Sequence, residues 1–196
     1  YEVDVLETFE AGEQVFYPEP GKVYFYENTA TTVRMVEHGE TPTNTSQVVV
    51  GYASTKEVIT FGQMPARLRG GVHTTVLSPD ARYVYLIGGG LGMGGGPGSA
   101  RTASSLLKVD ALTLQPVKHM NIGGRLHHGQ IFQDRYLLLD MFTSDPDALD
   151  VFLFDPETDE IIGGISGDDL GGRNYTSYTD DEFIYVLMQP AGANAR

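Results

Sequence analysis

Three histidines stand at the start of short apolar runs and are the side chains best suited to chemistry. His73 lies in GGVHTTVLSPD, and His127 and His128 lie together in GGRLHHGQIFQD. Histidine is the commonest metal-binding side chain, so imidazoles brought together could hold copper or zinc. They could also transfer a proton, or only hydrogen-bond backbone carbonyls at strand ends. The sequence leaves these three interpretations open.

Two tyrosines take the corresponding place in a later segment, GRNYTSYTDD, as Tyr175 and Tyr178. A site lined with histidine and tyrosine side chains could bind a small polar molecule. Adjacent residues of a strand point to opposite faces, so we expect only one of His127 and His128 to face the site. The candidate ligand-binding residues are His73, His127, His128, Tyr175 and Tyr178, and the three histidines are the candidate metal ligands.

The remaining motifs favour loops and turns. Residues 88–98, GGGLGMGGGPG, contain a formal G-x-G-x-x-G, but Pro97 and a strand follow in place of the helix that a dinucleotide site needs. We expect a flexible insertion that could lie over a channel mouth or a partner. Carboxylates cluster at residues 144–150, 155–160 and 167–169 without an EF-hand pattern, which favours solvated turns. No G-x-S-x-G or H-E-x-x-H motif occurs.

Composition excludes several functional classes. The formal net charge of −13 argues against binding to nucleic acid or to an anionic membrane surface. The chain has no cysteine, which excludes disulfides, thiolate metal ligands and cysteine nucleophiles. No apolar run is long enough to span a membrane, and the start, YEVDVLETF, lacks the features of a signal peptide. We therefore expect either a cytoplasmic protein or a chain that is already processed.

The elements that must position these residues are β-strands. Apolar residues come in short alternating or continuous runs bounded by Gly, Pro, Asp and Asn, which predicts an all-β fold. Four runs look alike: GKVYFYE, ARYVYLI, DRYLLLD and DEFIYVL. Three strand-turn-strand segments recur between them: VGYASTKEVITFG, LKVDALTLQPVKHM and FLFDPETDEIIGGI. In the last two, Asp110 and Asp155 are placed to hydrogen-bond the turn's own backbone.

This order predicts a β-propeller of four-stranded antiparallel blades, with strands A to D running from the centre outward. The four runs are strands B, and the innermost strands A are expected at residues 14–18, 73–77, 126–132 and 175–179. The chain would form a single propeller domain, residues 1–196, or a propeller fragment, with about three to four blades. A β-sandwich is the alternative, but the fixed order of both repeats favours the propeller. The histidines would then gather at one mouth of the central channel.

The stretch from KVYFYEN to LKVDALTLQPVKHM resembles the propellers of quinoprotein amine dehydrogenase heavy chains, a superfamily with YVTN-type repeats. The resemblance lies in the SPDARYVYL turn and in Val109, Asp110, Thr113, Leu114 and Pro116 of the following hairpin. It implies a periplasmic seven-bladed scaffold that supports a small catalytic subunit carrying a tryptophan-derived quinone. This chain has no tryptophan and so could not be that catalytic subunit.

In another respect the chain is similar to nitrous oxide reductases, whose propeller histidines, including an adjacent pair, hold a copper–sulfide cluster. His73, His127 and His128 lie in comparable places. Two functions are therefore expected. One is a periplasmic or secreted binding or scaffold subunit of an amine-dehydrogenase-like redox complex, which would bind a protein subunit or a small polar ligand. The other is a copper-dependent oxidoreductase.

Overall fold

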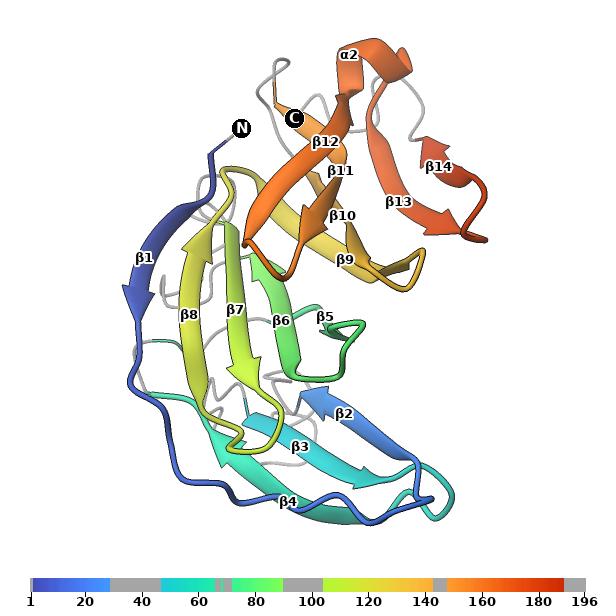
Figure 1. Ribbon diagram of the computed structural model, residues 1–196. Helices are drawn as coiled ribbons and strands as arrows, with labels where there is room; N and C mark the ends of the chain where they lie inside the picture. Colours follow the sequence, from blue (N-terminus) through green and yellow to red (C-terminus); the bar gives the residue numbers. More distant parts are fainter. Residues whose placement is uncertain are drawn as a thin grey trace, which may run out of the picture.

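The computed structural model describes residues 2–28, 47–65, 68, 72–89, 104–142 and 148–188 of the chain. These residues form four antiparallel sheets that are set side by side as the blades of a propeller (Figure 1). In this part of the chain one short helix occurs, α2 (Gly167–Leu170), and no helix could cross a membrane. The all-β fold and the propeller predicted from the sequence are confirmed.

Two blades are complete four-stranded meanders. The first contains β5 (Thr74–Leu77), β6 (Tyr83–Gly89), β7 (Ser104–Asp110) and β8 (Pro116–Asn121). The second contains β9 (Arg125–Phe132), β10 (Tyr136–Phe142), β11 (Leu149–Asp155) and β12 (Glu160–Ser166). In each, neighbours in the chain are neighbours in the sheet, so the predicted order A to D is correct.

The other two sheets have fewer strands. One contains β2 (Tyr24–Asn28), β3 (Gln47–Tyr52) and β4 (Val58–Gln63), and the other contains β13 (Asn174–Thr179) and β14 (Ile184–Met188). The first strand of the chain, β1 (Asp4–Thr8), adds to the outer edge of the β5–β8 blade by pairing with β8. That blade is therefore five strands wide (Figure 1).

The strand A predicted at residues 14–18 is absent. The backbone N–H groups of Val15 and Phe16 both donate to the carbonyl of Leu112, so this segment lies against a turn instead of pairing with β2. Phe16 is the one buried residue of this segment. Its ring packs edge-on against that of Tyr24, with the two ring centroids 4.9 Å apart. With one buried side chain, the segment does not show the alternation of buried and exposed residues that a half-buried strand has.

The two complete blades bury apolar side chains on both faces, and β6 shows how. Tyr85 and Ile87 enter the core shared with the β9–β12 blade, whereas Val84 and Leu86 enter the core shared with the β2–β4 sheet. Alternate residues of a strand point to opposite faces, so one continuous apolar run serves two cores. All four side chains are fully buried. This explains why the B strands of the two complete blades, β6 and β10, are continuous apolar runs.

Aspartates close the outer hairpins as predicted. The Asp110 Oδ1 atom accepts hydrogen bonds from the N–H groups of Leu112 at 2.9 Å and Thr113 at 2.8 Å. The Asp155 Oδ1 atom accepts one from the N–H of Glu157 at 2.9 Å. These bonds satisfy backbone groups that the reversal of the chain removes from the ladder.

A buried ion cluster joins the two complete blades. Lys108, on β7, donates to the Asp159 carboxylate at 2.7 Å and to the Pro156 carbonyl at 2.9 Å, and Lys118, on β8, also pairs with Asp159. Lys108 is 5% exposed and Asp159 is 8% exposed, so both charges depend on this pairing.

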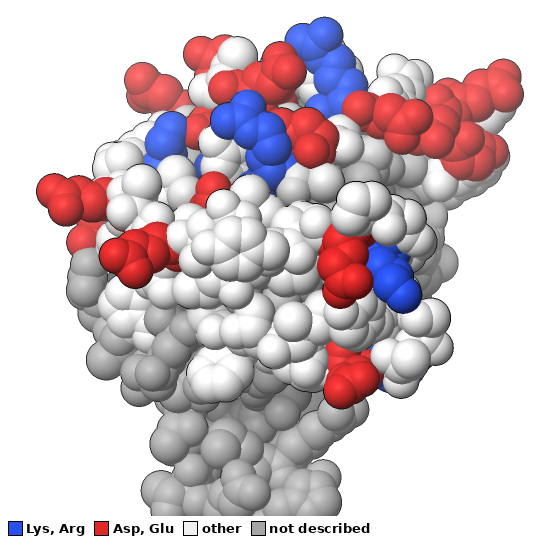
Figure 2. All heavy atoms as spheres, turned by 60° about the horizontal axis from the view of Figure 1, so that its bottom comes forward, with Lys and Arg blue, Asp and Glu red and all other residues white. Residues whose placement is uncertain are grey.

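Many acidic side chains, with a few basic ones among them, lie at the surface along the upper part of the view in Figure 2, where solvent screens their charges.

Replacing Asp159 with Asn tests this cluster. Asp159 has a positive φ of 59°, which Asn tolerates, so Asp159→Asn removes the charge without backbone strain. We expect the free energy of unfolding to fall by about 3 kcal/mol, because two lysines lose their buried partner. Chemical denaturation measures the change. Glu157→Gln, an exposed change in the same turn, is the control, and equal stability of the two variants would contradict the expectation.

Candidate functional site

The three candidate histidines converge. His73 lies immediately before β5, and His127 and His128 lie on β9; one potential ligand atom from each lies within 4.8 Å of the others. The His73 and His127 rings stack with centroids 4.3 Å apart, and the His127 and His128 centroids are 3.7 Å apart. His73 is exposed, His128 is half-buried and His127 is buried. Two neighbouring blades therefore contribute imidazoles to one cluster.

Both histidines of the adjacent pair join this cluster, so the expectation that only one would face the site is wrong. The pairing of β9 with β10 shifts at this point: Leu139 pairs with Gly129, but Met141 pairs with Leu126. His127 and His128 together therefore lie opposite Asp140, which is a β-bulge. A bulge breaks the strict alternation of side chains, and it turns both imidazoles toward His73.

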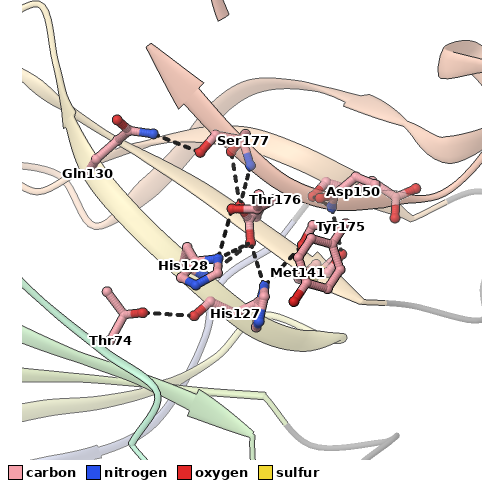
Figure 3. A network of polar contacts seen from close by, with 11 residues as sticks. Thr74, His127, His128, Gln130, Met141, Asp150, Tyr175, Thr176 and Ser177 are labelled. Carbon is pink, nitrogen blue, oxygen red and sulfur yellow. Dashed lines mark hydrogen bonds and ion pairs between the residues drawn. The ribbon is translucent and has the colours of Figure 1, made fainter. Parts of the chain in front are cut away.

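A second bulge lies in the neighbouring inner strand, β13. Asn174 pairs with Met188 and Thr176 with Leu187, so Tyr175 is the extra residue. The Tyr175 carbonyl lies 3.1 Å from the Nδ1 atom of His127 (Figure 3). A carbonyl can only accept, so in the neutral ring of His127 the hydrogen lies on Nδ1 and the lone pair on Nε2. The two bulges together orient the buried histidine.

Asp140 is the polar centre beneath the histidines, on β10. It is 1% exposed, and its Oδ1 atom accepts a hydrogen bond from the backbone N–H of His128 at 3.0 Å. Its Oδ2 atom accepts from the Ser177 N–H at 2.8 Å and the Ser177 hydroxyl at 3.0 Å. Burial raises the pKa of Asp140, and these hydrogen bonds and the nearby His128 oppose the rise. The carboxylate thus links β9, β10 and β13 at the site.

Thr176 lies between Asp140 and His128. Its hydroxyl oxygen is 2.9 Å from the Nδ1 atom of His128 (Figure 3). The same oxygen is 3.4 Å from the Oδ2 atom of Asp140. On the other side of the cluster, the Thr74 hydroxyl donates to the His127 carbonyl at 3.0 Å. Both inner strands that flank β9 therefore hold its histidine pair through hydroxyl groups.

The two candidate tyrosines differ in position. The Tyr175 ring centroid is 5.7 Å from that of His127 and belongs to the edge of the cluster. Tyr178 lies three residues along β13, about 10 Å away along an extended strand, and pairs with Tyr185 of β14. Phe142 lies closer, with its ring centroid 4.5 Å from that of His127. The structure therefore brings Tyr175 to the histidines and places Tyr178 at the other end of the strand.

Sequence reasoning missed Asp140, Thr176 and Ser177. A weak signal existed for Asp140, because it is a carboxylate between Leu139 and Met141, which are both buried. A charge inside a buried run needs partners, and that need predicts a polar site. Thr176 and Ser177 gave no such signal, because their role depends on the β13 bulge.

The other candidate motifs lie partly outside the described residues. Of residues 88–98, Gly88 and Gly89 end β6, and residues 90–98 lie outside the described part of the chain. A strand, β7, follows from Ser104 as predicted. Residues 144–147 of the first carboxylate cluster also lie outside. Among described residues the histidines are the one group of three or more that could hold a metal ion.

Asp150, at the start of β11, is a titratable group beside this region. It is 4% exposed, and burial raises its pKa from 3.8 to about 6, although Arg173 and the Gly167 backbone N–H oppose the rise. Because the folded pKa exceeds the unfolded one, the folded chain binds this proton more tightly. Stability from this group is therefore present at low pH and is lost as pH rises from about 4 to about 6.

Asp150→Asn tests this pH dependence. The amide cannot ionise, so the melting temperature of the wild type should fall relative to that of the variant as pH rises through this window. Thermal unfolding followed by circular dichroism between pH 4 and 7 measures the difference. Asp134→Asn, an exposed change in the β9–β10 turn, reports the effect of removing one negative charge. A constant difference for Asp150→Asn across the window would contradict the raised pKa.

Comparison with known proteins shows the fold. No protein-family model and no curated protein matches the chain. A solved structure, "Dihydro-heme d1 dehydrogenase NirN in complex with DHE", is similar to it with a TM-score of 0.56 at 16% sequence identity. The similarity covers 95% of this chain and 34% of that one, so this chain spans about a third of the length of NirN. The fold class that the blades and this likeness define is the β-propeller.

Proposed function

We propose that this chain is a propeller module of an extracytoplasmic redox protein, and that His73, His127 and His128 bind a transition-metal ion, with copper as the first candidate. The convergence of three imidazoles from two blades carries the proposal. The likeness to NirN, a dehydrogenase, supports a redox-associated propeller. The histidine pair supports the copper alternative, similar to nitrous oxide reductase.

The donor set suits such an ion. Two imidazole nitrogens bound tetrahedrally at about 2.1 Å lie about 3.4 Å apart, and modest rotation would bring ligand atoms now within 4.8 Å to that spacing. Imidazole suits copper and zinc, and three protein ligands leave a position open for a reacting molecule. The buried Asp140 carboxylate, 3.7 Å from the Nδ1 atom of His127, would offset part of the cation's charge. These properties favour a reactive site over a purely structural one.

A binding or scaffold subunit is the second candidate, and the exposed aromatic face beside the site favours it. Tyr175, Tyr178, Tyr185 and Leu187 of β13 and β14 are each about half exposed, between 48% and 59%. Exposed aromatic residues on a rigid sheet are typical of contact surfaces. A protein subunit, as in an amine-dehydrogenase-like complex, or a small polar ligand would then bind at the channel mouth.

Metal analysis of protein purified without a histidine tag separates the two functions. After incubation with Cu(II) or Zn(II) and dialysis, we expect the wild type to retain a stoichiometric amount of metal. His73→Ala should lose most of it, because one of three ligands is removed, and its exposure makes misfolding a minor concern.

His119→Gln is the control for loss of a histidine elsewhere, because His119 lies on β8, outside the cluster. It should retain metal as the wild type does. A wild type that stays metal-free after incubation with both ions would contradict the metal site and favour the scaffold function. Equal metal retention by His73→Ala and His119→Gln would do the same.

A further inference from the structure

We infer that Asp140 and Thr176 are positioning residues that hold His128 in the tautomer with its hydrogen on Nδ1, so that its Nε2 lone pair is available to a metal ion. The inference rests on the proposed function, because a metal ion is what the Nε2 lone pair would bind. The tautomer itself can be measured without any metal. The atoms concerned are the Oδ2 of Asp140, the Oγ1 of Thr176 and the Nδ1 of His128.

The direction of these hydrogen bonds follows from Asp140. Its two oxygens already accept from two backbone N–H groups, those of His128 and Ser177, which cannot reverse their role. An ionised carboxylate can only accept, and it is a stronger acceptor than a neutral imidazole. The Thr176 hydroxyl therefore donates to Asp140, and its oxygen accepts from the Nδ1–H of His128.

His127 also carries its hydrogen on Nδ1, but a backbone carbonyl, and not a hydroxyl group, holds it there. His127 donates its Nδ1–H to the Tyr175 carbonyl at 3.1 Å, and a carbonyl has no hydrogen to give. Both rings therefore place their hydrogens toward β13 and leave Nε2 unprotonated. A carbonyl fixes His127, and a hydroxyl that a carboxylate orients fixes His128.

This arrangement prepares the cluster for a ligand. A metal ion binds the unprotonated nitrogen of imidazole, and partners on the other nitrogen fix ring orientation and raise ligand basicity. Without the hydroxyl, His128 would populate both tautomers and several ring orientations. Loss of such a partner elsewhere typically weakens metal binding by about 10- to 100-fold.

Nitrogen-15 NMR of the histidine side chains in the metal-free protein at about pH 8, where imidazoles are mostly neutral, tests the tautomer. In the wild type, His128 should show a protonated Nδ1 and an unprotonated Nε2; His128→Gln assigns its signals. Thr176→Val keeps the branched shape of the side chain and removes the hydroxyl, so the two nitrogens should shift toward averaged values. Thr176→Ser should restore the wild-type pattern.

Ser177→Ala is the matched control, because the Ser177 hydroxyl also donates to Asp140 and has no hydrogen bond to His128 among those described. A purely structural role of the network predicts similar changes in both variants. The inference predicts that Thr176→Val alone changes the His128 tautomer and lowers Zn(II) affinity about tenfold in competition with a chromophoric chelator.

The outcomes are separable. A wild-type His128 with its hydrogen on Nε2, or an unchanged tautomer in Thr176→Val, overturns the inference whether or not metal binds. If Thr176→Val fails to fold, the wild-type and Thr176→Ser spectra still decide the tautomer. A wild type with the stated tautomer that binds neither Cu(II) nor Zn(II) overturns the proposed metal function and leaves the positioning of His128 established.

Discussion

The two complete blades depend on covering both faces of their sheets. A strand such as β6 carries Val84, Tyr85, Leu86 and Ile87 in succession, and a single-sided sheet would leave two of them in water. Packing a further sheet on each side buries all four, and the twist of the sheets turns such a stack into a radial array. The inner strands are then brought close together around one axis. Convergence of residues distant in sequence is thus a result of core packing.

The histidine cluster depends on two β-bulges, which interrupt the regular alternation of side chains. Strict alternation would send His127 and His128 to opposite faces, one of them into an apolar interface where its ring nitrogens would need partners. The β9 bulge sets both opposite Asp140, and the β13 bulge frees the Tyr175 carbonyl to accept from His127. Bulges are enriched next to functional sites because they redirect side chains. Here two of them, in adjacent blades, lie at the same level.

The repeats in the sequence were sufficient for the architecture. The B strands and outer hairpins were predictable because their turn residues and apolar runs are local signals, and Asp110 and Asp155 mark the same turn twice. The absence of a strand at residues 14–18 was not predictable, since the sequence alternates there as a strand would although only Phe16 is buried. The gathering of the histidines followed from the fold, but the bulge, and the roles of Asp140 and Thr176, depend on contacts between strands far apart in sequence, which no local pattern records.

The pairing of β1 with β8 bears on how the chain assembles. Asp4 of β1 pairs with Asn121 of β8, so this ladder joins two strands that lie more than 100 residues apart in the sequence. Closing so long a loop is entropically costly, so we expect β1 to pair with β8 after the β5–β8 meander has formed. Until then the outer edge of β8 is open to pairing with another molecule. The first strand therefore protects a nearly finished blade from intermolecular association.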